Sequence, residues 1–222
     1  MKRLITVAVV IAALITAAGA TAETLEMGSM SPLTGPYAAD GTDIKNGVLT
    51  AIEVIKSEGG VTGFDDITLS AQDTACDPRQ AVAAANKLIN EEVKAVVGAY
   101  CSSSTLPASE VLMEEDIVMI TPASTNEKVT DRGLPYMFRT CGRDDDQSKA
   151  AVAFMKDHLG AKTVYLVDDK TAYSQGLADN VEKGAKEAGL KVLGHEHVNQ
   201  GDKDFSAVLT KIKQADPDVF YI

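Results

Sequence analysis

Short apolar runs alternate with helix-like segments along most of this 222-residue chain. The runs have the length of strands, and in the segments between them apolar residues recur at helical spacing. Repeated strand–helix units form parallel sheets with helices on both faces, so the sequence predicts an α/β fold. We expect strands at residues 25–30, 67–72, 95–99, 117–121, 163–167, 191–197 and 219–222. We expect helices at residues 44–57, 78–91, 102–115, 147–159, 173–188 and 205–214.

One segment interrupts this alternation. Residues 125–142 contain Gly133 and Pro135 and show neither periodicity, so we interpret them as a crossing between two lobes. The first lobe would comprise residues 23–140, and an incomplete second lobe residues 141–222. The chain ends in an apolar run at 219–222, and a terminal carboxylate on a buried strand would be costly. We therefore expect an N-terminal part of a longer protein; a complete domain that ends there is the alternative.

The first 22 residues have the pattern of a secretory signal peptide. Lys2 and Arg3 precede an apolar run at 4–18, and Ala20-Thr21-Ala22 supplies the small residues of a cleavage site. An uncleaved membrane anchor is the alternative, although the run is shorter than the roughly 20 residues that span a bilayer. Cleavage removes two of the 21 basic residues and leaves 19 against 32 acidic ones, a net charge of −13. Such a charge repels nucleic acid, so we expect none as a partner.

Three cysteines in an exported chain raise the question of pairing. Cys76 follows the strand expected at 67–72, and Cys101 follows the strand expected at 95–99. If these strands are neighbours in a parallel sheet, their carboxyl ends lie close together, and an oxidising compartment favours a Cys76–Cys101 disulfide. Two free buried thiols are the alternative. Cys141 has no predicted role beyond that of a small buried residue.

Two segments rich in hydroxyl groups follow expected strands: residues 100–105 (YCSSST) and 121–125 (TPAST). Open α/β sheets bind small ligands at the carboxyl ends of their strands. Ser102 begins an expected helix, whose free N–H groups favour an anion. Because no nucleophile and base stand out together, the pattern indicates reversible binding of a small zwitterion or anion rather than catalysis. The alternative for Ser102, Ser124 and Thr125 is an ordinary role in caps and turns.

Two other groups contain residue types that bind metal ions. His195 and His197 alternate on one face of an expected strand, but no third ligand is evident, and we interpret them as surface histidines. The run Asp144-Asp145-Asp146-Gln147 resembles a helix start with a capping arrangement. The sequence therefore predicts no metal site, and it indicates no cofactor.

The order of the motifs resembles the leucine/isoleucine/valine-binding family, the periplasmic receptors of branched-chain amino acid ABC transporters. The resemblance rests on DTACDP at 73–78, CSSST at 101–105, TPAST at 121–125, DDDQ at 144–147 and DKTAYSQG at 169–176. It implies a type I periplasmic binding protein fold with two Rossmann-like lobes, of which the second is truncated here. It also implies an aliphatic amino acid as the ligand, a membrane ABC permease as the partner and the periplasm as the location.

The same resemblance implies roles for individual residues. The ligand carboxylate would meet the hydroxyl and N–H of Ser102 and the N–H of Thr125, in the segment that also holds Ser124. The ammonium would meet the carbonyl of Ala123 and the hydroxyl of Thr125, and Tyr173 would close over the ligand. The position of Tyr100, directly before Cys101 at a strand's carboxyl end, leads to a separate prediction: its ring would narrow the pocket toward small aliphatic side chains.

The chain departs from the family pattern in two places. Where the family has an aromatic ring after the first strand, this chain has Asp40, so either Tyr37 takes that place or the wall is polar. An acidic partner for the ammonium is expected beyond Ile222.

These features favour a monomeric solute receptor that delivers an amino acid to a permease. An exported sensory module with the same fold is the alternative function, and an enzyme on this scaffold ranks third, because a fold does not fix a function. The sequence does not identify the amino acid.

Overall fold

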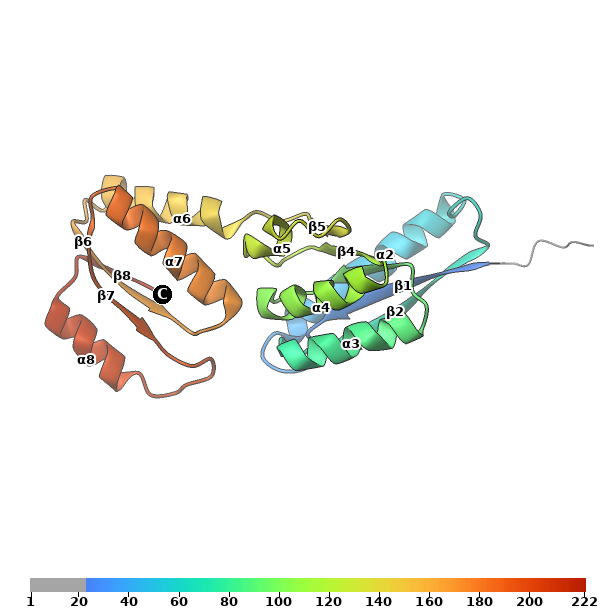
Figure 1. Ribbon diagram of the computed structural model, residues 1–222, viewed down its shortest axis with the longest axis horizontal. Helices are drawn as coiled ribbons and strands as arrows, with labels where there is room; N and C mark the ends of the chain where they lie inside the picture. The colour runs from blue at the N-terminus through green and yellow to red at the C-terminus, as the bar shows by residue number, and fades with distance from the viewer. Residues whose placement is uncertain (1–22) are drawn as a thin grey trace, which may run out of the picture.

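The computed structural model describes residues 23–222, which form two lobes joined end to end (Figure 1). The signal peptide expected at residues 1–22 lies outside the described residues. Both sheets are parallel, as predicted. The sheet of the first lobe has the order β2 (Asp66–Asp73), β1 (Thr24–Ser31), β3 (Ala95–Gly98), β4 (Val118–Thr121) and β5 (Met137–Arg139). The sheet of the second lobe has the order β7 (Lys191–His197), β6 (Thr163–Asp168) and β8 (Val219–Tyr221).

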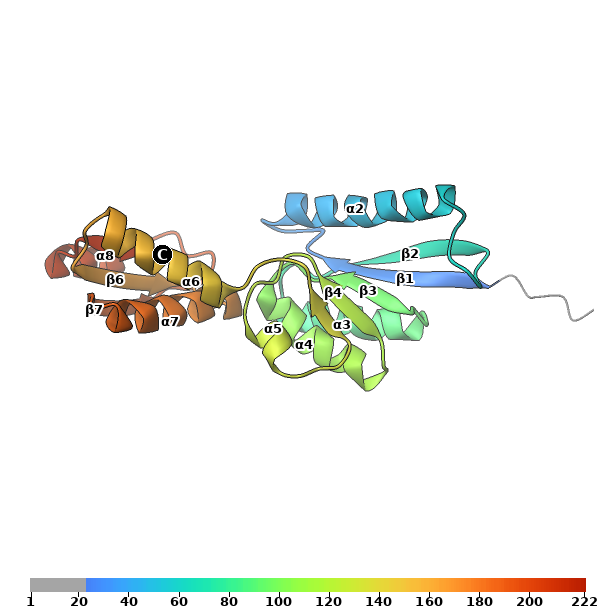
Figure 2. The ribbon, with the colours of Figure 1, turned by 90° about the horizontal axis from the view of Figure 1, so that it is seen from above.

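Helices cover the first sheet on both faces (Figure 2). On one face α3 (Pro78–Asn90) and α4 (Ser102–Glu114) pack over the strands, and their side chains form a core with Leu88, Val96, Leu112 and Met119, each at most 1% exposed. On the other face lies α2 (Ala38–Ser57), which begins six residues before the predicted start at Ile44.

The fifth strand is a correction to the sequence-based interpretation. Residues 125–142 do not simply cross between the lobes, because they contain α5 (Lys128–Asp131) and β5. β5 pairs with β4 along its whole length and buries Met137 in the first core. The link between the lobes is therefore short and begins after β5.

The second lobe also carries helices on both faces of its sheet. On one face lie α6 (Asp144–Ala153), its π-helical extension η1 (Phe154–His158) and α7 (Ala172–Glu187), which share a core with Val164 and Leu166. On the other face lies α8 (Ser206–Ala215), packed against Tyr165 and Val167. None of the helices within residues 23–222 has the length and apolar character of a membrane span.

The last strand, β8, lies at the edge of the second sheet. Phe220 is 52% exposed and Ile222 is 76% exposed, so the expectation of a buried strand at 219–222 is wrong for these residues. Val219 and Tyr221, which alternate with them, pack against the core formed with α7.

The predicted Cys76–Cys101 disulfide is present, with Cα atoms 5.5 Å apart. The reasoning behind it needs correction, because β2 and β3 are not neighbours: β1 lies between them. The turns after β2 and β3 instead meet across the end of β1. The bond therefore fixes both turns at the carboxyl edge of the sheet.

Replacing both bonded cysteines by serine should lower the free energy of unfolding by about 3 kcal/mol, because the bond closes a 25-residue separation and restricts the unfolded chain. Urea denaturation of the oxidised protein measures this change. The variant Cys141→Ser removes the free thiol and serves as the control, with an expected change below about 1 kcal/mol. Equal stability of the double variant and the control would show that the bond does not restrain the unfolded chain.

Candidate functional site

A cavity of about 740 Å³ lies between the two lobes, at the carboxyl ends of their strands. The first lobe contributes Tyr37, Tyr100, Cys101, Ser102, Ser103, Ala123 and Thr125 to its wall. The second lobe contributes Asp168, Asp169, Thr171, Tyr173, Ser174, Val198, Asn199, Gln200, Gly201, Phe205 and Ile222. The structure thus brings five of the six expected ligand-binding residues to one cavity; Ser124 is the exception.

Ser124 has its side chain turned into the protein. Its Oγ is 2.6 Å from the hydroxyl of Thr105 and lies within hydrogen-bond distance of the carbonyl oxygens of Ala99 and Tyr100. Its N–H donates to Oγ1 of Thr121 at 3.0 Å. Ser124 is 1% exposed, and its contacts fix the segment 121–125 to the end of β3.

The N-terminus of α4 faces the cavity with Ser102 and Ser103. Cys101 is the N-cap, and its carbonyl accepts from the N–H groups of Ser104 and Thr105. The first N–H groups of a helix have no partner within the helix and carry a partial positive charge. The Oγ of Ser102 accepts from the N–H of Asn126 at 3.3 Å, which leaves its own proton free to be donated elsewhere. This end of α4 is therefore suited to hold an anion.

Arg139 fixes the loop that faces this helix end. Its Nη1 donates to three successive carbonyl oxygens, those of Ser124 (3.3 Å), Thr125 (3.0 Å) and Asn126 (2.8 Å). With these carbonyls turned toward Arg139, the Ala123 carbonyl and the Thr125 N–H remain without a protein partner among residues 23–222. The loop thus presents one acceptor and one donor beside the donors of Ser102.

Three tyrosines give the cavity an aromatic wall. The rings of Tyr37 and Tyr100 are 5.8 Å apart, and Tyr173, which is 41% exposed, lines the cavity from the second lobe. After β1 the sequence left open whether Tyr37 supplies the aromatic ring of the family or whether the wall is polar. The structure favours Tyr37, because Tyr37 lines the cavity and Asp40 does not. Burial raises the pKa of Tyr100, and the nearby carboxylate of Asp40 adds to this. Tyr100 therefore stays neutral.

Asn126, which follows the predicted segment directly, was not identified from the sequence. Its side chain is 2% exposed and donates from Nδ2 to the carbonyl of Ala172 at the start of α7, at 2.7 Å. Its N–H contacts Ser102 in the first lobe. Gly176 leaves room for this contact, because a Cβ there would overlap the amide of Asn126. Asn126 therefore links the helix end in the first lobe to the second lobe.

The acidic run at the start of α6 differs from the expected capping arrangement. The N-cap is Arg143, and no side chain caps the helix. Asp145 instead pairs with Arg143 at 2.9 Å. Asp144 is fully buried, and neither of its carboxylate oxygens has a hydrogen-bond partner among the described residues. This burial raises the pKa of Asp144. The free thiol of Cys141, just before this run, donates to the carbonyl of Ser124 at 3.6 Å.

Replacing Arg139 by glutamine should lower the free energy of unfolding by about 2–4 kcal/mol, since hydrogen bonds to a charged donor each contribute about 1.5–3 kcal/mol and leave unpaired carbonyls when removed. Chemical denaturation gives the value. The control is Lys149→Gln, which removes an exposed ion pair with Asp146 and should cost less than about 1 kcal/mol. Similar losses in both variants would contradict the role of Arg139 in holding the loop.

The buried carboxyl group of Asp144 leads to a prediction about how the stability of the protein depends on pH. Because its folded-state pKa is raised, the folded state binds more protons than the unfolded state between the two pKa values, and stability from this group falls as the pH rises through that window. The stability of Asp144→Asn minus that of the wild type should therefore increase from acidic to neutral pH. The exposed Asp146→Asn is the control. Parallel stability curves for wild type and Asp144→Asn would refute the effect of burial.

Known proteins resemble this chain in sequence and in structure. A profile of the family described as periplasmic binding protein matches residues 24–222. The leucine-, isoleucine-, valine-, threonine- and alanine-binding protein of Pseudomonas aeruginosa is 42% identical over 200 residues, 90% of this chain and 53% of that protein. The Leu/Ile/Val-binding protein homolog 1 of Brucella melitensis is 40% identical over 221 residues, 100% of this chain and 59% of that protein. The chain spans about half the length of these curated relatives.

Solved structures agree on the fold. A leucine binding protein from Thermotoga maritima superposes with a TM-score of 0.82 at 32% identity, over 89% of this chain and 55% of that one. A type 1 periplasmic binding protein from Bordetella pertussis superposes with a TM-score of 0.80 at 24% identity, over 89% of this chain and 55% of that one, which supports the fold alone. The predicted α/β fold and the resemblance to Leu/Ile/Val-binding proteins are both confirmed. With two parallel sheets that meet at a shared cavity and a profile match over residues 24–222, the chain belongs to the periplasmic binding protein family.

Proposed function

We propose that the protein is a periplasmic receptor that holds a small aliphatic amino acid in the cavity between its lobes and delivers it to a membrane ABC permease. The observation that carries this proposal is the meeting of the α4 N-terminus with the loop at 123–125 on one wall of that cavity. Ser102 and the N–H of Thr125 are donors for a carboxylate, and the carbonyl of Ala123 and the hydroxyl of Thr125 are acceptors for an ammonium. These donors and acceptors lie on the same wall of the cavity. An α-amino acid needs both kinds of group side by side.

The carboxylate would bind at Ser102 and Thr125. The hydroxyl of Ser102 has its proton available, and the first N–H groups of α4 and the N–H of Thr125 add donors without a protein partner among the described residues. Neutral donors suit this task, because they bind a charged group without adding a cation to the cavity. The field of the helix end favours the anion further.

The ammonium would bind at the Ala123 carbonyl and the Thr125 hydroxyl. Pro122 and the contacts of Ser124 hold this segment, so that the Ala123 carbonyl keeps its direction in the absence of a ligand. Asp169, which also lines the cavity, contributes negative charge from the second lobe. The Ser124 side chain has no part in the site that we propose, since it faces the core.

The ligand side chain would lie among Tyr37, Tyr100 and Tyr173. Aromatic rings bury apolar surface, and the close pair of Tyr37 and Tyr100 limits the space on the first-lobe side. This wall favours an aliphatic side chain of modest size. The names of the matched relatives are those of amino acid binding proteins, which favours a transport receptor over a sensory module or an enzyme.

The variant Ser102→Ala tests the carboxylate site. Loss of one hydrogen bond to a charged group, about 1.5–3 kcal/mol, should weaken binding of leucine, valine or alanine by about 10- to 100-fold. Isothermal titration calorimetry, with displacement titrations where direct binding is too weak or too tight, gives the affinities. The control variant is Ser57→Ala, whose hydroxyl bonds within α2.

Competition between leucine and an analogue without its carboxylate tests the carboxylate site separately from the ammonium site. Leucinamide, which lacks the carboxylate, should not compete with leucine in the wild-type protein. Equal binding of leucine and leucinamide, or unchanged affinity in a folded Ser102→Ala variant, would contradict the proposed site.

A further inference from the structure

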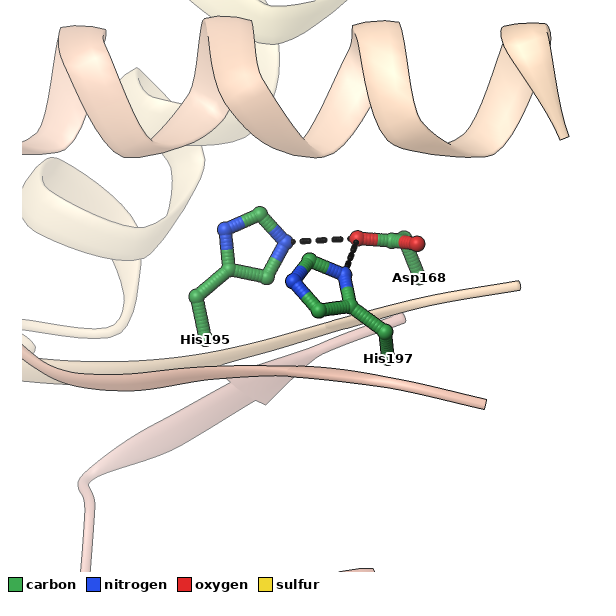
Figure 3. Close-up of side chains that lie close together, drawn as sticks. All are labelled: Asp168, His195 and His197. Carbon is green, nitrogen blue, oxygen red and sulfur yellow. Dashed lines mark hydrogen bonds and ion pairs between the residues drawn. The ribbon is translucent and has the colours of Figure 1, made fainter. Parts of the chain in front are cut away.

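Asp168, His195 and His197 lie together at the carboxyl edge of the second sheet (Figure 3). Oδ2 of Asp168 is 2.8 Å from Nε2 of His195 and 2.5 Å from Nδ1 of His197. Asp168 is fully buried, and the two imidazole rings are 4.9 Å apart. The His195 side chain is only 13% exposed, so the interpretation of both histidines as surface residues is wrong for His195. Asp168 is the third group that the sequence did not reveal.

The register of β6 and β7 creates this cluster. Asp168 and His197 are direct partners across the two strands. The pairing of Asp168 with His197 results from a one-residue shift in the strand register between Val164 and Tyr165. Without this shift, Asp168 would pair with Glu196, which is a second carboxylate. Gly194 permits the shift, because a Cβ at this position would lie 2.6 Å from the ring of Tyr165.

Glu182 on α7 sets the orientation of His195. Its Oε2 is 2.9 Å from Nδ1 of His195, so a neutral imidazole that binds a metal ion through Nε2 would donate its Nδ1 proton to Glu182. Nε2 then carries a lone pair that faces the carboxylate oxygen of Asp168. Two lone pairs at this distance repel each other unless a proton or a cation lies between them. One divalent cation placed between the three groups would accept lone pairs from Asp168, from Nε2 of His195 and from Nδ1 of His197 together.

We propose that Asp168, His195 and His197 bind a divalent transition-metal ion, with Zn²⁺ as the best match. Zn²⁺ takes imidazole and carboxylate ligands at about 2.0–2.2 Å, and three protein ligands leave a fourth position for water. Tetrahedral geometry at these lengths separates the ligand atoms by about 3.3 Å, so each nitrogen has to move by less than about 1 Å. A histidine ligand usually donates its other N–H to a carboxylate, and Glu182 lies 2.9 Å from Nδ1 of His195 in position to accept it.

The ion would join two strand ends at the rim of the interlobe cavity. Asp168 lines the cavity, and the segment that follows His197 contributes Val198, Asn199 and Gln200 to the same wall. A bond from His197 through the ion to Asp168 restrains this segment. The ion would therefore restrain the second-lobe wall of the cavity, at a place separate from the donors on the first lobe.

Metal titration of the exported protein tests the proposal, with the protein purified without a polyhistidine tag and stripped by a chelator. We expect one equivalent of Zn²⁺ in calorimetry, and visible Co²⁺ absorption bands of a low-coordinate nitrogen–oxygen site. His197→Ala changes an exposed side chain and should weaken binding by more than about 100-fold, while Glu182→Gln should weaken it by about 10- to 100-fold. The control is His158→Gln, on the extension of α6, with unchanged binding.

Three results would overturn the proposal. The first is that the wild-type protein binds no Zn²⁺ at neutral pH. The second is that a folded His197→Ala variant binds as tightly as the wild type, which would assign any ion to the other group of potential ligands, Asp179, Glu182 and His195. The third is a near-ultraviolet thiolate band in the Co²⁺ spectrum, which would assign the ion to Cys141. Circular dichroism of each variant establishes that it is folded.

Discussion

The candidate site depends on the hydrogen bonds that the guanidinium of Arg139 donates to the loop after β4. The guanidinium holds the carbonyls of Ser124, Thr125 and Asn126 on one side of the loop after β4, and so determines which backbone groups of that loop remain for a ligand. Arg139 can do this because β5 adds to the edge of the first sheet beside β4. The strand that the sequence did not predict is thus the one that positions the binding loop.

Hydrogen bonds of the same loop contribute to the contact between the two lobes. The N–H of Asn126 donates to Oγ of Ser102 on one side, and its side-chain amide donates to the carbonyl of Ala172 at the start of α7 on the other. On the opposite side of the cavity, Gln200 donates to the hydroxyl of Tyr37 at 3.4 Å. Hinge movement changes the separation of two lobes around a ligand, and it would break and remake these hydrogen bonds. The loop that we propose to bind the ligand would therefore also sense closure of the second lobe.

The sequence predicted the fold well because strand and helix periods are local properties, whereas contacts across the sheet are not. Residues Met137–Arg139 of β5 are too few to show a period, and Gly41 lies inside α2 because the helix packs closely on Pro32, a tertiary reason. The motifs located the cavity, but they do not tell which way a hydroxyl points, so Ser124 was included. The pairing of Asp168 with His197 depends on a register shift that no local pattern records.

The central claim is that the amino acid binds to the end of α4 and to the loop fixed by Arg139. Titration of the ¹⁵N-labelled protein with leucine, followed by amide chemical shifts, tests this claim most directly. We expect the largest shifts at the N–H groups of Ser102, Ser103 and Thr125, because these amides would donate to the carboxylate. Shifts confined to the second lobe, at residues 198–201 or around Tyr173, would contradict the account, because the ligand would then bind without the donors of the first lobe.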